Sequence, residues 1–226
     1  MTRRTNARIA GFTFLFYIAV AFPSMVLFNK ATSGVGISAK LASIAQHVTE
    51  MRVTVLLTVL SSFSALVLAV TLYAITRDED REVALLGFAC RVGEGLLGAI
   101  PMTTLGLLWL ATTAGPNAPD AVAAGALANF LLNVSEWQTT SSAILFTVGS
   151  TAFSYLLLRG RMIPVPLAWV GLVGSALLVV GLPLQLAEFL RGPITQLMWI
   201  PVAVFELTLG PWLLIKGVRP PAARSP

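Results

Sequence analysis

Charged residues are scarce in this sequence. Only 11% of its 226 residues are charged and 56% are hydrophobic, whereas soluble domains carry roughly 25% charged residues. With a mean hydropathy of +0.83, the composition excludes a soluble globular protein. We predict an all-α polytopic membrane protein, with a single membrane domain over residues 1–217 and a disordered cytoplasmic tail over residues 218–226.

Cysteine and histidine occur once each, as Cys90 and His47. One cysteine excludes an internal disulfide, and one residue of each type does not supply the ligands of a zinc site. The motifs H-E-x-x-H and G-x-S-x-G and a Gly-rich phosphate loop are also missing. We therefore assign no catalytic, cofactor-binding or metal-binding residue and do not favour an enzyme. Cys90 is interpreted as a small apolar helix residue rather than an activated thiol.

Long apolar runs fill most of the chain. Each has about 20 residues or more, the number needed to cross a hydrocarbon core. The runs are 9–28, 53–75, 83–112, 139–158, 164–187 and 196–215. They predict a bundle of six transmembrane helices. The first run is interpreted as a retained helix and not as a signal peptide, because no A-x-A cleavage site follows it.

Basic residues lie mainly at the ends of these runs. Ten flank one set of ends: Arg3, Arg4, Arg8, Arg77, Arg81, Arg159, Arg161, Lys216, Arg219 and Arg224. Four flank the other set: Lys30, Lys40, Arg52 and Arg191. The positive-inside rule then places both termini in the cytoplasm. Because no basic stripe with interleaved aromatics is present, the expected partner is the lipid bilayer and not a nucleic acid.

Two segments on the less positive side are predicted to be helical. Apolar residues recur at helical spacing over 37–51 as Ile37, Leu41, Ile44, Val48 and Met51. This pattern indicates an amphipathic helix lying in the outer interface. His47 flanks that stripe and is interpreted as an interfacial polar residue, in preference to a pH sensor or ligand-binding role. Asp120 is expected to cap a weak helix running toward Ser135.

The turn RDEDRE over 77–82 connects the second and third runs. Its Asp78 and Asp80 carry carboxylates of the kind that bind divalent cations. We favour the interpretation that the aspartates cap the third run, because such side chains accept hydrogen bonds from the free N–H groups at a helix start.

Three ionisable residues fall at membrane depth. At a rise of about 1.5 Å per residue, Arg91, Glu94 and Glu206 lie roughly 13, 18 and 15 Å from the more positive face. Charges at this depth normally face the bundle interior and pair. Arg91 with Glu206 is the pairing we expect first. Arg91 and Glu94 are also neighbours at i, i+3, so one guanidinium could hold both carboxylates.

Nearby residues are compatible with such a buried cluster. Gly87, Gly95 and Gly98 would let a neighbouring helix approach closely, and Pro101, Pro201 and Pro211 each free a backbone carbonyl. Ser61, Ser62, Ser64, Thr147, Ser150 and Ser175 occur at similar depth and predict an interior lined by hydroxyl groups.

The cluster of Arg91, Glu94 and Glu206 has three interpretations. It is first a structural clasp that fixes helix register, or a site for a small hydrophobic or ionic ligand. The alternative is a transporter-like path for protons, ions or a small solute through the bundle interior. The third is the site of an intramembrane, lipid-modifying enzyme.

Four stretches in fixed order carry a family resemblance: ARIAGFTFLFYIAV, FACRVGEGLLGAI, LLLRGRMIPVPLAWVGLVG and VFELTLGPWLLIKGV. Together they resemble the bacterial membrane family catalogued as domain of unknown function 4386, over nearly the whole chain. The resemblance implies several membrane spans, residence in a bacterial inner membrane, no assigned activity and no known cofactor. It also implies that Arg91, Glu94 and Glu206 correspond to polar positions of the family.

Overall fold

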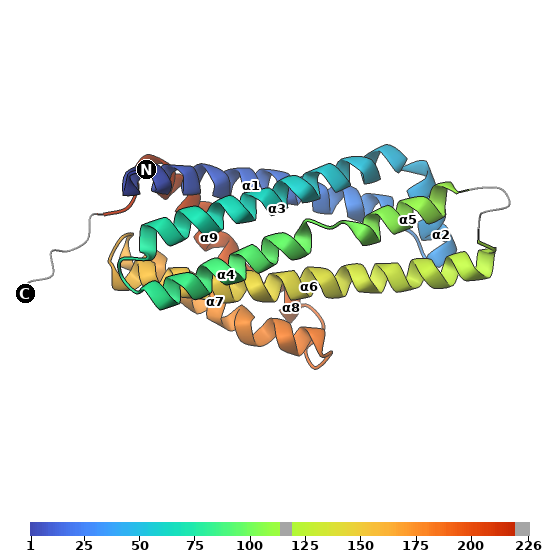
Figure 1. The fold of residues 1–226 in the computed structure, drawn as a ribbon. Coiled ribbons are helices and arrows are strands. Elements are labelled where there is room, and N and C mark those ends of the chain that lie inside the picture. The colour runs from blue at the N-terminus through green and yellow to red at the C-terminus, as the bar shows by residue number, and fades with distance from the viewer. Residues whose placement is uncertain (114–118, 220–226) are drawn as a thin grey trace, which may run out of the picture.

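The structure is a computed structural model that describes residues 1–113 and 119–219, and these residues form nine α-helices and no strand (Figure 1). The helices are α1 (Arg3–Ala31), α2 (Ile37–Gln46), α3 (Val48–Thr76), α4 (Arg81–Gly98), α5 (Met102–Thr112), α6 (Ala121–Arg159), α7 (Val165–Leu186), α8 (Ile194–Leu197) and α9 (Ile200–Ile215). The tail predicted over 218–226 lies outside the described residues from position 220 onward.

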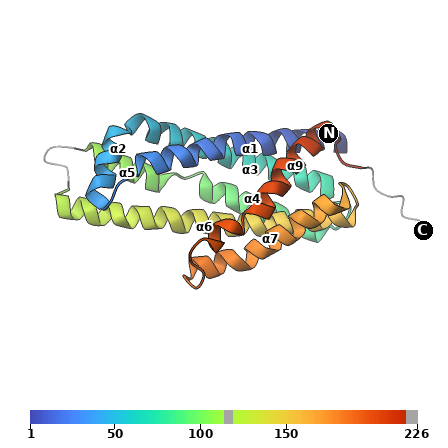
Figure 2. The ribbon, with the colours of Figure 1, turned by 180° about the vertical axis from the view of Figure 1, so that it is seen from behind.

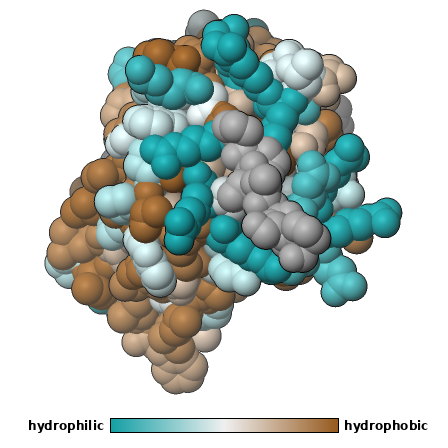
Figure 3. All heavy atoms as spheres, turned by 90° about the vertical axis from the view of Figure 1, so that its left-hand side faces the viewer, coloured by the Kyte–Doolittle hydropathy of each residue, from teal (hydrophilic) through white to brown (hydrophobic). Residues whose placement is uncertain are grey.

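Six helical stretches are long and apolar enough to cross a membrane, as the sequence predicts. They are α1, α3, α4 with α5, α6, α7, and α8 with α9. The start of α1 and the end of α9 lie at the same end of the bundle (Figure 1). We call this the terminal end and the opposite one the distal end. Hydrophilic side chains gather over the terminal end, while the flank formed by α7 is hydrophobic (Figure 3).

The crossing helices form a closed ring. Each packs against the next in the order α1, α3, α4, α6, α7 and α9, and α9 packs against α1. The apolar core of the terminal half includes Phe14, Leu68, Phe153, Phe205 and Leu209. Close helix approach at the predicted glycines is confirmed, because a Cβ on Gly87 would lie 3.1 Å from the Phe153 ring and one on Gly95 would lie 3.1 Å from the Ser62 carbonyl oxygen.

Helix α6 is longer than predicted. The weak helix expected to end near Ser135 and the apolar run 139–158 form one helix of 39 residues, because no proline or glycine separates them. Asp120 caps it as predicted, accepting the Ala123 N–H at 2.8 Å. At about 1.5 Å per residue the helix is roughly 58 Å long. Since a hydrocarbon core is only about 30 Å thick, the distal part of α6 projects beyond it.

The third span is broken at Pro101. Helix α4 ends at Gly98 and α5 begins at Met102. Proline has no N–H, so the carbonyl of Leu97 loses its partner four residues later. Gln138 of α6 replaces that partner, with its Nε2 donating to the Leu97 oxygen at 2.6 Å. The freed carbonyl that the sequence predicts is thus paired by another helix.

Helix α2 confirms the helix predicted after α1 but corrects its extent and its packing. It ends at Gln46, and the chain turns at His47 into α3, so Met51 belongs to α3. Its apolar face packs against protein, because Ile44 is fully buried in a cluster with Met51 of α3, Leu107 of α5 and Ala128 of α6. The His47 imidazole has a local contact, with Nδ1 2.8 Å from the Ser43 carbonyl oxygen.

Candidate functional site

The buried charges begin with an ion pair within α4. Arg91 is 1% exposed, and its Nη1 donates to Glu94 Oε2 at 2.7 Å. The guanidinium carbon also lies 4.8 Å from the centroid of the Phe146 ring and 6.0 Å from that of Phe14. Among the described residues, Arg91 Nε is buried without a hydrogen-bond partner. The arginine is therefore held by one carboxylate and two aromatic faces.

A glycine on α6 makes room for the arginine stem. A Cβ on Gly149 would lie 3.0 Å from Arg91 Cγ and 3.2 Å from the Gly87 carbonyl oxygen. These separations are below ordinary van der Waals contact. Close packing of α4 on α6 and burial of the Arg91 side chain therefore depend on the same glycine.

Tyr17 of α1 joins the Arg91–Glu94 ion pair. It was not assigned to the cluster from the sequence. Its hydroxyl donates to Glu94 Oε1 at 3.3 Å, so both oxygens of Glu94 have partners. The backbone carbonyl of Glu94 also accepts the Ser142 hydroxyl at 3.3 Å. The one signal in the sequence was position, because Tyr17 is the tyrosine that falls in the middle of an apolar run.

Glu206 lines the same cavity as Glu94 but does not form the ion pair that we expected first. The direct partner of Arg91 is Glu94, one turn away on the same helix. Helix α9, which carries Glu206, packs against α1 and α7 rather than against α4. Glu206 is 8% exposed, and its carboxyl group has no hydrogen bond or ion pair within the described part of the chain.

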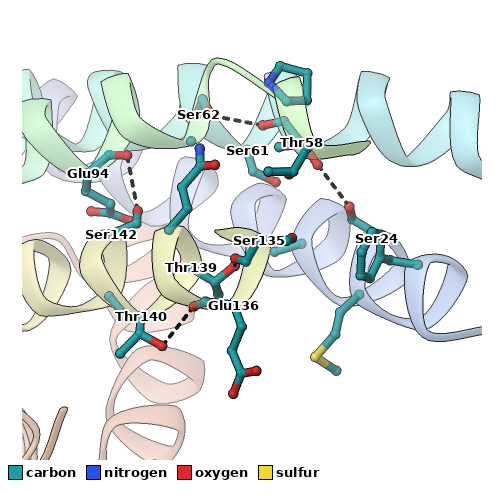
Figure 4. A pocket seen from close by; sticks show the side chains of 18 of the residues that line it. Ser24, Thr58, Ser61, Ser62, Glu94, Ser135, Glu136, Thr139, Thr140 and Ser142 are labelled. Carbon is teal, nitrogen blue, oxygen red and sulfur yellow. Dashed lines mark hydrogen bonds between the residues drawn. The ribbon is translucent and has the colours of Figure 1, made fainter. Parts of the chain in front are cut away.

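A cavity of about 800 Å³ connects this cluster to the distal half of the bundle. Lys40 of α2 lines it at the distal side, and Tyr17, Glu94 and Glu206 line its deepest part, which we call the floor. Hydroxyl side chains from α1, α3 and α6 face it (Figure 4). The lining hydroxyl residues are Ser24, Thr54, Thr58, Ser61, Ser62, Thr103, Thr104, Ser135, Thr139, Thr140 and Ser142.

The hydroxyl-lined interior predicted from the sequence is thus present but is built largely from other residues. Ser61 and Ser62 line the cavity, whereas the other four predicted residues do not. Ser175, for example, accepts a hydrogen bond from Thr151 in the contact between α7 and α6. Depth along a helix is readable from sequence, but the direction of each side chain depends on how the helix is rotated in the bundle.

Several of these hydroxyl groups use their one proton on their own helix. Thr54, Ser62 and Thr140 each donate to the backbone carbonyl four residues earlier, at 3.0, 2.9 and 3.0 Å. A hydroxyl whose proton is committed in this way can only accept from a further partner. The cavity wall therefore presents hydrogen-bond acceptors.

Asp80 of the 77–82 turn has the predicted structural role, whereas Asp78 is exposed and lies 3.8 Å from the Arg77 side chain. Asp80 Oδ1 accepts the Val83 N–H at 3.2 Å, which confirms the predicted cap of α4. Its Oδ2 accepts from Arg159 at 3.0 Å. Within residues 1–113 and 119–219, no group of three or more His, Cys, Asp or Glu side chains is placed to hold a metal ion.

The fold and the cavity together define an α-helical, multi-pass membrane protein with six spans around an acidic-floored, hydroxyl-lined interior. A family model described as "Domain of unknown function (DUF4386)" matches residues 9–217. The chain belongs to this family, which confirms the resemblance carried by its four sequence stretches. Neither the curated proteins nor the solved structures gave a match.

Proposed function

We propose that this protein is a non-enzymatic membrane protein that binds a small cationic ligand in the cavity. In this proposal Glu206 is the ligand's counter-ion, and the Arg91–Glu94 pair supports the floor. The observation that carries it is the Glu206 carboxyl group, which lines the cavity without a protein partner. We further propose a bacterial inner-membrane location with cytoplasmic termini, supported by the excess of basic residues at the terminal end.

The balance of charge favours a cation over an anion. The described residues that line the cavity include three glutamates, Glu94, Glu136 and Glu206, and one lysine, Lys40. Glu94 is already compensated by Arg91. An unpaired carboxylate is costly in an apolar interior, so an ammonium group next to Glu206 would offset that cost. The acceptor character of the hydroxyl lining supports the same choice.

The apolar lining adds a second requirement. Met25, Phe28, Leu132, Phe146 and Leu182 also face the cavity. Its volume of about 800 Å³ falls within the range of small-molecule pockets, roughly 300 to 1,000 Å³. A ligand that combines an ammonium group with alkyl or aryl groups would match both parts of the surface.

Trp199 provides a direct test because it lines the cavity. We expect ethyltrimethylammonium to change the tryptophan fluorescence of the purified protein in detergent, and the change to be lost in Trp199→Phe. Glu206→Gln should weaken binding, measured by calorimetry, at least tenfold. Glu82→Gln is the matched control, since it makes the same change on an exposed residue of the terminal end. Equal affinity of Glu206→Gln and the unmodified protein would refute the proposal.

Transport is a second candidate function, favoured by the break in the third span. The chain is interrupted at Pro101 between α4 and α5, and Pro211 lies within the continuous helix α9. Interrupted helices beside a midplane charge are a common construction of transporter sites. Proteoliposomes separate the two functions: time-dependent uptake of radiolabelled ethyltrimethylammonium, abolished in Glu206→Gln, would indicate transport, whereas saturable binding without uptake would indicate a binding protein.

A further inference from the structure

We propose that the natural ligand is a membrane-resident amphiphile, with a cationic head group and one apolar tail, that enters the cavity sideways between α1 and α6. This inference rests on the proposed cation site and adds both the class of ligand and its route. In the bound state, the head group lies at the floor beside Glu206 and the tail leads back toward the lipid.

The route follows from the helix order. Helices α1 and α6 are not neighbours in the ring: toward the terminal end, α7 and α9 fill the space between them. The α7–α9 hairpin ends partway along α6 (Figure 2), and α2 packs across the distal end. Between these two limits the cavity lining includes exposed residues from both helices, namely Met25 and Asn29 of α1 and Glu136 and Thr139 of α6. We call this opening the lateral mouth.

The depth of the lateral mouth places it at a membrane boundary. Met25 and Asn29 lie at the end of the apolar run 9–28, and Glu136 and Thr139 lie at the start of the run 139–158. These are the positions where hydrocarbon gives way to head groups. Trp137 lies beside the start of the run 139–158, and Trp199 lies near the start of the run 196–215. Tryptophan is enriched at this level of a membrane. An amphiphile in that leaflet therefore has its head group at the height of the opening.

The surface around the mouth suits an alkyl chain on the α1 side. Phe22, Met25 and Val26 are exposed on α1, with Met25 at 53%. Inside the mouth, Phe28, Leu132 and Leu182 continue the apolar lining. Glu136 points away from the neighbouring hydroxyl groups, at the edge of the cavity (Figure 4). The α1 side of the mouth is thus apolar, its α6 side carries Glu136, and the floor is acidic. An amphiphile can place its tail along the α1 side and its cationic head at the floor.

Gln185 of α7 supplies an independent observation. It lines the cavity, and its Oε1 is buried without a hydrogen-bond donor among the described residues. A buried acceptor left without a donor loses the hydrogen bonds that water would give it in the unfolded chain. Gln185 is the second-last residue of α7, at the distal end of that helix. An amphiphile that carries a hydroxyl or amide N–H along its chain, away from the ammonium group, would satisfy this acceptor while the ammonium group pairs with Glu206. We therefore include a second donor in the ligand class.

The test compares ethyltrimethylammonium with decyltrimethylammonium, the latter below its micelle-forming concentration. Each buried methylene group is worth about fourfold in affinity, so decyltrimethylammonium should bind at least tenfold more tightly. Met25→Trp, which narrows the mouth, should weaken its binding at least tenfold and leave ethyltrimethylammonium within twofold. The matched control is Phe12→Trp, an exposed residue of α1 that lies nearer the terminal end and does not line the cavity; it should change neither affinity.

A second variant separates blockage from misfolding. In a Cys90→Ala chain, Met25→Cys can be measured before and after attachment of a bulky maleimide to the folded protein, and the decyl compound alone should lose affinity. Equal losses for both compounds, or no gain from the longer chain, would overturn the lateral route. Decyl binding that persists in Glu206→Gln would overturn the head-group assignment. Failure of both compounds to bind the unmodified protein would instead refute the proposed cation site.

Discussion

Arg91 and Glu94 lie one turn apart on α4, and their contact fixes the direction of the arginine side chain. Tyr17 adds a neutral donor to the same carboxylate. Among the described residues, this arrangement leaves Glu206 as the buried carboxyl group that faces the cavity without a protein donor. At the scale of single residues, the two glutamates therefore have different surroundings, and their replacement has different consequences.

We expect Glu94→Gln to destabilise the protein more than Glu206→Gln, because only the first change removes the direct partner of Arg91. Arg91→Met should cost about 3 to 5 kcal/mol, the usual result of breaking one side of a buried pair. The double variant Arg91→Met with Glu94→Gln should be more stable than Arg91→Met alone. Thermal unfolding in detergent provides the comparison.

The Glu206→Gln variant is the internal control for that experiment. If its melting temperature falls as far as that of Glu94→Gln, the assignment of Glu94 as the principal partner is wrong. Strictly additive losses in the double variant would also contradict a direct interaction between Arg91 and Glu94.

At the scale of elements, the joint between α4 and α5 depends on a side chain from α6. Gln138→Ala removes the donor to the Leu97 carbonyl, a group that Pro101 leaves unpaired. The expected cost is about 0.5 to 1.5 kcal/mol, read from thermal unfolding. Asn133→Ala is the matched control, because the Asn133 amide donates only to the Asn129 carbonyl of its own helix; a similar loss there would show that the joint is not the cause.

The contact between α1 and α9 depends on Gly11. A Cβ at this position would meet the Leu214 backbone nitrogen and would lie 2.6 Å from the Gly210 carbonyl oxygen. We expect Gly11→Ala to separate the two helices and cost about 1 to 3 kcal/mol, as overpacking does. Gly125→Ala is the control, since its Cβ would lie 3.5 Å from Ile37. Equal melting temperatures for the two variants would contradict this role of Gly11.

At the scale of the whole molecule, an even number of spans places the start of α1 and the end of α9 on one side of the membrane. A reporter enzyme that works only in the cytoplasm should be active when it is fused after Arg224. The same reporter should be inactive when it is inserted between Gly115 and Asp120, because the basic residues are concentrated at the terminal end and this loop then lies on the outer side. Activity of both fusions in one compartment would refute the six-span topology.

Much of this architecture is encoded locally. The number of spans follows from the lengths of the apolar runs, and the caps at Asp80 and Asp120 follow from residue type and position. The presence of Arg91, Glu94 and Glu206 at one depth also follows from counting residues along two helices. The family resemblance was carried by short stretches in fixed order and is confirmed by the match over residues 9–217.

Side-chain partners required the tertiary structure. Sequence favoured Arg91 with Glu206, but the ring order puts α9 between α1 and α7, and the partner from the same helix is nearer. Tyr17 and most of the cavity hydroxyl groups were likewise not identified, because helix rotation decides which side chains face the interior. Local physics sets where a helix begins, how long it is, how deep its charges lie and which charges are neighbours on one helix. Packing between helices decides which charges on different helices meet.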